Sequence, residues 1–136
     1  MAGPDLVSSA PADGVVLVAV HGEHDIASAP GLRAAIEAGL GRSQHVVVDL
    51  TPATFVDSTV LGVLLGARER AREEELGYAV VLDHAAGDPA VRRILEVTGL
   101  DELLPVHRGR EAAVRDVAAA PGAPDASGSP DPEPPG

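Results

Sequence analysis

Three short runs of mostly β-branched residues constrain the fold of this 136-residue chain more than any other feature. They carry almost none of the alternating polar residues of a half-exposed strand, and they comprise residues 15–20, 46–50 and 78–82. Such strands are typically covered on one or both faces, as in a parallel sheet packed between helices. Longer segments with helical spacing separate them. We therefore expect an α/β domain with a mostly parallel, four- to five-stranded sheet and about four helices.

Capping residues, first-turn prolines and glycines delimit the expected helices. The helices are predicted over residues 29–40, 58–75, 89–98 and 110–119. Ser28 and Asp88 are the expected capping residues of the first and third helices, because their side chains can accept hydrogen bonds from unpaired backbone N–H groups. Leu6 and Val7 are expected to form a short edge strand that pairs with the first apolar run.

Composition argues against several classes of function. The chain has 10 basic and 21 acidic residues, all ten basic residues are arginine, and the formal net charge is −11. Phe55 and Tyr78 are the only aromatic residues. Nucleic-acid binding is disfavoured, because it needs a dense basic surface or aromatic stacking platforms. An acidic surface is better suited to contacts with other proteins.

The last residues differ in composition from the rest of the chain. Residues 120–136 hold six of the twelve prolines and no large apolar side chain, so we expect a disordered tail after one folded domain of residues 1–119. No stretch approaches the ~20 apolar residues that span a bilayer. The chain also has no cysteine, as is common in a reducing compartment. We expect a soluble, cytoplasmic protein without membrane contact.

The sequence Asp57-Ser58-Thr59 opens a strongly apolar helix. A hydroxyl at a helix N-terminus faces unpaired N–H groups and the positive end of the helix dipole, which together stabilise an added phosphate. Ser58 is therefore a chemically sensible phosphate acceptor. The plainer alternative is that Ser58 is only a capping residue, worth about 1 kcal/mol. Gly62 and Gly66 lie four residues apart in this helix and indicate a close approach by another element.

Other constellations point away from catalysis and metal binding. His21-Gly22-Glu23-His24-Asp25 has no spacing with a fixed ligand geometry, so we expect no metal. The chain has no Gly-x-Ser-x-Gly elbow and no glycine-rich phosphate loop. Asp25 and Asp57 are expected at the same end of the sheet, but no aromatic pocket supports an acid–base role for the pair. We predict a protein that is not an enzyme and needs no cofactor.

Five short segments occur in an order typical of one protein family. They are residues 22–25, 29–33, 46–50, 55–59 and 91–100. Together they resemble the sulfate transporter and anti-sigma-factor antagonist (STAS) domain over nearly all of residues 5–119, and in particular the stand-alone bacterial anti-sigma-factor antagonists. Gly22-Glu23-His24-Asp25 is similar to the family's Gly-Glu-x-Asp signature, and residues 55–59 are similar to its phosphorylation loop.

The resemblance implies a partner switch. In the family, an anti-sigma factor that is itself a serine kinase phosphorylates the first hydroxyl after the loop aspartate, which is Ser58 here. The unphosphorylated antagonist binds the kinase and frees the sigma factor, and a serine phosphatase later restores the antagonist. Added negative charge beside Asp57 is expected to weaken binding. We expect phosphorylation-site support or partner binding from seven neighbours: Glu23, Asp25, Asp57, Thr59, Val60, Leu61 and Gly62.

One residue departs from the family pattern. The two hydroxyl residues are usually followed by glycine, and this chain has Val60. A β-branched side chain there can crowd a kinase that brings ATP to Ser58, or shift the helix start. Two alternatives therefore stay open: a module that binds a small ligand, such as a nucleotide or lipid, at the Asp25/Ser58 end, and a scaffold that is not phosphorylated.

Overall fold

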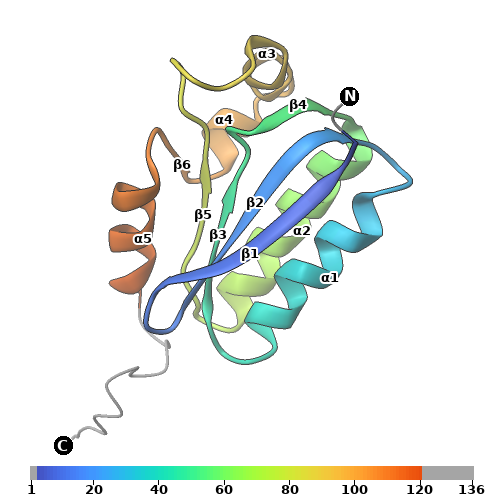
Figure 1. Cartoon of the computed structure of the whole chain (residues 1–136). Coiled ribbons are helices and arrows are strands. Elements are labelled where there is room, and N and C mark those ends of the chain that lie inside the picture. Colours follow the sequence, from blue (N-terminus) through green and yellow to red (C-terminus); the bar gives the residue numbers. More distant parts are fainter. Residues whose placement is uncertain (1–2, 121–136) are drawn as a thin grey trace, which may run out of the picture.

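The computed structural model describes residues 3–120 and shows a sheet with helices on both faces (Figure 1). The strands are β1 (Asp5–Ala12), β2 (Val15–His24), β3 (His45–Asp49), β4 (Ala53–Val56), β5 (Tyr78–Val81) and β6 (Val106–His107). The helices are α1 (Ala29–Leu40), α2 (Ser58–Glu73), α3 (Pro89–Thr98), α4 (Leu100–Leu103) and α5 (Arg110–Ala118). The expected tail lies outside the described residues, except for Ala120.

The sheet has the strand order β1-β2-β3-β5-β6, and β4 pairs with β2. β1 is antiparallel to β2, and every other pairing is parallel. β2 pairs with β3 through residues 15–19 and with β4 from Gly22 onward. The register shifts between Gly22 and Glu23, and Gly22 has a φ of 81°, a conformation that glycine adopts without strain. Gly22 thus marks the point at which β2 changes partner.

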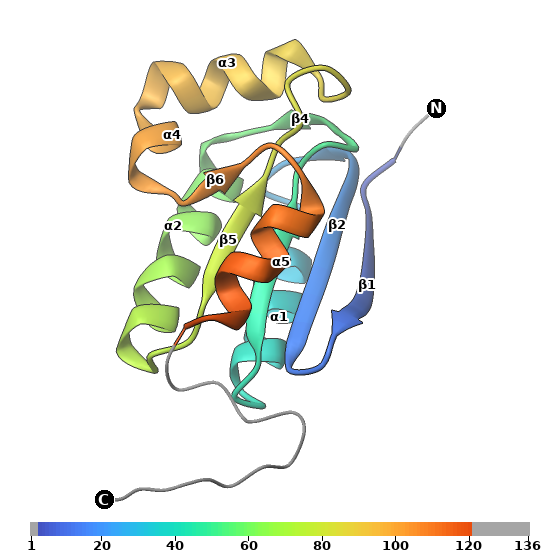
Figure 2. The same ribbon diagram turned by 90° about the vertical axis from the view of Figure 1, so that its left-hand side faces the viewer.

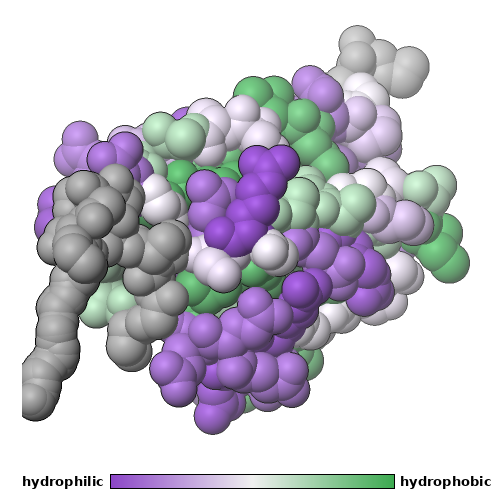
Figure 3. Space-filling view, turned by 90° about the horizontal axis from the view of Figure 1, so that it is seen from below, coloured by the Kyte–Doolittle hydropathy of each residue, from purple (hydrophilic) through white to green (hydrophobic). Residues whose placement is uncertain are grey.

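The helices form three groups around the sheet. α1 and α2 pack side by side on one face, and α5 lies alone on the other (Figures 1 and 2). α3 lies across the carboxyl ends of the strands, next to β4 (Figure 2). The opposite end, where β2, β3 and β5 begin, shows large hydrophilic patches with apolar residues between them (Figure 3). The carboxyl end of the sheet is therefore framed by β4, α3 and the start of α2.

The core consists of small aliphatic side chains on both faces of the sheet. Alternate residues of β2, β3 and β5 belong to a larger cluster with α1 and α2 or to a smaller cluster with α5. Val48 and Val47, for example, are neighbours in sequence that enter opposite clusters, and both are fully buried. Tyr78 adds a polar anchor, because its hydroxyl donates a hydrogen bond to the backbone oxygen of Leu64 in α2 at 2.9 Å. The sequence predicted strands covered on one or both faces, and in the structure β2, β3 and β5 are covered on both.

The predicted α/β class with a mostly parallel sheet is confirmed, and the structure adds three short elements. β4, β6 and α4 have four residues or fewer, so the sheet has six strands and the described residues form five helices. Such short elements show no periodicity in sequence and depend on tertiary pairing. The predicted edge strand at Leu6–Val7 is present but extends from Asp5 to Ala12.

The predicted capping roles were confirmed in part. Ser28 occupies the N-cap position of α1 as predicted, but its side chain makes no capping hydrogen bond to the helix; its hydroxyl oxygen instead accepts a hydrogen bond from the N–H of Asp25 at 3.0 Å. The cap of α2 is Asp57 and not Ser58. Asp88 caps α3 as predicted, by accepting a hydrogen bond from the N–H of Ala90, and Gly99 ends the helix with a φ of 76°. No helix within residues 3–120 is long and apolar enough to cross a membrane.

Candidate functional site

The candidate site lies where β2 and β4 end side by side. In the parallel pairing of these strands Glu23 is opposite Phe55, and His24 is opposite Val56. The residue that follows each of these strands is an aspartate, Asp25 after β2 and Asp57 after β4. Because neighbouring strands are about 4.8 Å apart, the fold brings these two turns together, as the sequence predicted.

Asp57 sets the position of the candidate phosphate acceptor. Its carboxylate accepts a hydrogen bond from the N–H of Val60 at 3.1 Å, and its backbone is extended, with φ −106° and ψ −177°. Helix α2 therefore begins at Ser58, whose side chain is exposed, as is that of Thr59. Since Asp57 is the cap, the simple reading of Ser58 as a capping residue does not hold.

The next two residues of α2 face the core. Val60 is completely buried, and Leu61 is 4% exposed. Both belong to the larger core cluster. The Val60 side chain therefore does not cover the exposed face on which Ser58 lies, and the helix start is not displaced. Val60 and Leu61 anchor the first turn of α2, and neither presents a side chain that a partner could contact directly.

Asp25 stabilises a tight turn between β2 and α1. Its carboxylate accepts a hydrogen bond from the N–H of Ala27 at 2.9 Å, and its backbone oxygen accepts the N–H of Ser28 and that of Ala29. Asp25 and Glu23 are both exposed. With Asp57 half-buried nearby, three carboxylates belong to the same end of the sheet as Ser58.

Two exposed apolar side chains adjoin these acids. Phe55 is 45% exposed and Ile26 is 70% exposed, although most apolar side chains of the sheet and of α1 and α2 are buried. Neither was among the predicted site residues. Phe55 carried a signal that could have found it, because it is one of two aromatic residues in the chain and directly precedes Val56-Asp57-Ser58. Phe55 and Ile26 thus add exposed apolar side chains to an end of the sheet that also carries exposed acids, a combination found at many protein contacts.

A buried histidine lies beneath the same turn. His24 is 1% exposed, and its Nε2 donates a hydrogen bond to the backbone oxygen of His21 at 3.0 Å. Its Nδ1 has no hydrogen-bond partner among the described residues. His24 is therefore part of the buried interior of β2. Within the predicted His21–Asp25 constellation, the exposed side chains are those of Glu23 and Asp25.

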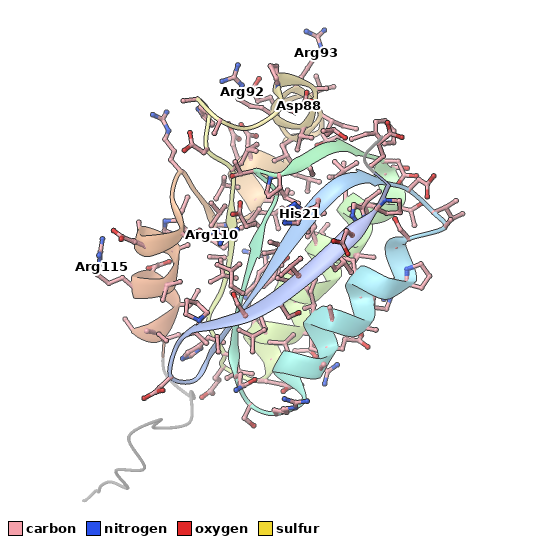
Figure 4. All side chains as sticks on the ribbon, viewed as in Figure 1. His21, Asp88, Arg92, Arg93, Arg110 and Arg115 are labelled. Carbon is pink, nitrogen blue, oxygen red and sulfur yellow. The ribbon has the colours of Figure 1, made fainter. Side chains whose placement is uncertain are left out.

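Helix α3 contributes charges of the opposite sign to this end of the molecule. Arg92 and Arg93 point away from the sheet, and Asp88 lies at the start of the same helix (Figure 4). Arg92 makes an ion pair with Glu96 at 3.9 Å, an exposed contact worth little in water. A partner that covers the carboxyl end of the sheet would meet both the acids of β2 and α2 and the arginines of α3.

Residues 3–120 contain no group of three or more His, Asp or Glu side chains placed to hold a metal ion. A cavity of about 280 Å³ lies at the ends of β3 and β5, lined by Asp49, Thr51, Asp83, Arg108 and Arg110 among others, and not by Ser58. In it, Arg110 donates a hydrogen bond to the buried Asp49 at 2.6 Å.

Gly62 and Gly66 face open space, contrary to the close packing that was predicted. A Cβ added at either position would have no neighbouring atom within 4 Å. Leu61 and Leu64, on the other side of the helix, are buried, and Leu65 packs partly against the core. Nothing within the described fold therefore requires glycine at these two positions.

Comparison with known proteins identifies the class that this fold and site define. The STAS domain model matches residues 9–113, and the chain belongs to the STAS domain family. It is 30% identical over 106 residues to the anti-sigma F factor antagonist of Paenibacillus polymyxa, covering 76% of this chain and 87% of that protein. It is 33% identical over 90 residues to the anti-sigma-B factor antagonist of Listeria monocytogenes, covering 64% and 74% of the two chains.

A solved structure agrees with these relatives. The crystal structure of an anti-sigma factor antagonist from Mycobacterium paratuberculosis matches this fold with a TM-score of 0.74 and 32% sequence identity. The match covers 85% of this chain and 95% of the other. The predicted family is confirmed.

Proposed function

We propose that this chain is an anti-sigma-factor antagonist that binds a serine-kinase anti-sigma factor, frees its sigma factor, and is switched off by phosphorylation of Ser58. A serine phosphatase returns it to the binding state. The names of the relatives support the antagonist role. The observation that supports the switch is that Ser58 is exposed at the first position of α2, directly after the capping Asp57.

The first turn of α2 is well suited to present a hydroxyl to a kinase. Asp57 fixes the helix start through its hydrogen bond to Val60, and the buried side chains of Val60 and Leu61 fix its rotation. Ser58 is thereby held on the surface without help from its own side chain. A kinase needs such an accessible hydroxyl, since the acceptor oxygen must align with the γ-phosphate.

Charge explains how one phosphate would release the partner. A phosphoserine carries about −1.5 to −2 charges at neutral pH, and Ser58 shares its end of the sheet with Glu23, Asp25 and Asp57. An interface over Phe55 and Ile26 would have to desolvate this charge, which is unfavourable next to like charges. The amino end of α2 favours an anion within the domain itself. Phosphorylation therefore lowers affinity for the partner without unfolding the antagonist.

The buried Val60 is compatible with this switch. Its side chain packs into the core beneath the first turn of α2, so it does not crowd the approach to Ser58. We expect the Val60→Gly variant to lose core packing and stability without a large gain in phosphorylation rate. A much faster reaction of that variant would show instead that Val60 restrains the kinase.

The test is a reaction of the full chain with a purified kinase-type anti-sigma factor and ATP, followed by mass spectrometry of the modified residue. We expect phosphate on Ser58 in the wild type and in Thr59→Ala, and none in Ser58→Ala. Thr59→Ala is the matched control, because Thr59 is the adjacent exposed hydroxyl. Stable binding without modification would identify a scaffold and overturn the proposed switch.

A further inference from the structure

The face of the sheet that carries α5 has an open groove beside the β1–β2 hairpin. We call it the hairpin groove; it has a volume of about 430 Å³, and its lining includes Pro11, Ala12, Arg110, Val114, Arg115 and Ala118. Figure 2 shows α5 over the middle of the sheet, with β1 at the margin beyond it. Val7 in β1 is 48% exposed. The groove floor is apolar, and arginine side chains contribute to its rim.

The chain itself supplies a segment that begins at this groove. α5 ends at Ala118, which lines the groove, and sixteen residues follow the last described residue, Ala120. Those residues, 121–136, contain six prolines, three acids (Asp125, Asp131 and Glu133) and no basic residue. A proline-rich strand needs no partner strand and loses little entropy when it lies on an apolar surface.

We propose that residues 121–136 dock along the hairpin groove, antiparallel to α5, with Asp125 against Arg115. Pro121-Gly122 is a turn sequence that follows the end of α5 after two intervening residues, and the proposed docking requires the chain to reverse direction there. The tether favours this occupant over any partner in solution, because it holds the segment at a high effective concentration.

Spacing along the helix selects this register. Arg115 lies three residues before Ala118, so it is about 4.5 Å further back along α5 at a rise of 1.5 Å per residue. An extended chain that leaves the turn at Ala123 covers that distance in about two residues, at about 3.1 Å each, and so reaches Arg115 with Asp125. Glu111 also lines the groove one helical turn further on. In this register Glu111 faces Ser127, which is neutral, and no carboxylates are opposed.

Arg115 is available for this contact. It is exposed, and it makes no ion pair with any described residue, whereas Arg110 is held by Asp49. Figure 4 shows the Arg115 side chain projecting outward from α5. An exposed ion pair adds only modest stability, so the docked segment would exchange with a free state and respond to salt.

Paramagnetic labelling of the full chain tests the proposal. The sequence has no cysteine, so Ser129→Cys accepts a single nitroxide label. We expect strong broadening of the amide signals of Ala12, Glu111 and Val114, and little broadening of Glu75. Glu75 is the internal control, because its loop also lies near the end of α5 but outside the hairpin groove. The proximity follows from Gly77, two residues further along this loop: a Cβ added there would be 2.6 Å from the backbone oxygen of Val117 in α5.

Charge variants decide whether the broadening reports the proposed register. Arg115→Glu should shift the docked-to-free ratio about fivefold towards the free state, and Asp125→Arg combined with Arg115→Glu should restore it. Equal broadening at Glu75 and in the groove, unchanged by Arg115→Glu, would overturn the proposal. Broadening that appears only between a labelled and an unlabelled molecule would assign the groove to a second copy of the chain, and would overturn it as well.

Discussion

The carboxylate of Asp57 accepts a hydrogen bond from the backbone N–H of Val60 at 3.1 Å. This contact spans Ser58 and Thr59, fixes the start of α2, and leaves both hydroxyl side chains exposed. The proposed switch depends on it, because a hydroxyl that is itself used as the cap would be less available to a kinase.

Replacing Asp57 tests its role as the cap. We expect Asp57→Ala to lower the free energy of unfolding by about 1 kcal/mol, and Asp57→Asn to lower it much less, because asparagine caps nearly as well as aspartate. Urea unfolding followed by circular dichroism measures both values. Equal losses in the two variants would mean that the charge of Asp57, and not its hydrogen bond to Val60, stabilises the helix.

The two exposed glycines of α2 give a second prediction. Gly62→Ala and Gly66→Ala should each raise the free energy of unfolding by up to about 1 kcal/mol, because an added Cβ meets open space and alanine favours the helix. Thermal unfolding measures the gain. If the partner covers the first turns of α2, Gly62→Ala should weaken binding to the anti-sigma factor more than Gly66→Ala does, because Gly66 lies one helical turn further from Ser58.

Gly77 gives the opposite prediction. A Cβ at this position would lie 2.6 Å from the backbone oxygen and 2.8 Å from the Cα of Val117 in α5. Because a backbone cannot move aside as a flexible side chain does, Gly77→Ala should lower stability by about 1–3 kcal/mol. Gly66→Ala serves as the control in the same unfolding assay. An unchanged midpoint for Gly77→Ala would show that α5 is not held against this loop.

Stability should depend on pH through His45. Its Nδ1 accepts a hydrogen bond from the N–H of Gly77 at 2.7 Å, and burial lowers the pKa of His45 below its usual value. The unfolded chain takes up a proton near pH 6.5, while the folded chain does so only at lower pH. The contribution of His45 to stability is therefore complete above pH 6.5 and is lost as the pH falls through 6.5 towards the folded pKa.

The matched variant for this prediction is His45→Asn, whose side-chain oxygen can replace Nδ1 as acceptor but does not titrate. Unfolding free energies between pH 8 and 5 should fall more steeply for the wild type than for His45→Asn. Parallel pH profiles for the two proteins would assign the loss of stability to the carboxylates.

Much of the fold could be predicted, because the strands on which it depends carry strong local signals. The apolar runs at 15–20, 46–50 and 78–82 became β2, β3 and β5, and Gly99 ended α3 as expected. β4 and β6 could not be predicted, since four and two residues carry no periodic pattern and their pairing partners are distant in sequence.

Part of the candidate site could also be predicted from the sequence. The family pattern pointed to Ser58 and the neighbouring acids as candidate site residues, and the β2–β4 pairing places them at one end of the sheet. The alternative in which Ser58 is only the cap was wrong, because aspartate and serine are both good caps and only the backbone position of α2 distinguishes them. The orientation of Val60 towards the core likewise depends on the residue at which α2 begins, because a start one residue earlier or later would turn each side chain by about 100° around the helix axis.

Binding of charge variants at Ser58 tests the central claim most directly. Affinity of the full chain for a purified kinase-type anti-sigma factor, measured without ATP by calorimetry, should be the same for the wild type and Ser58→Ala. The affinity of Ser58→Asp should be at least about tenfold weaker, because a charge buried beside Asp57 costs more than about 1.4 kcal/mol. Thermal unfolding of Ser58→Asp checks that the variant is folded. Equal affinity for Ser58→Asp and Ser58→Ala would contradict the account.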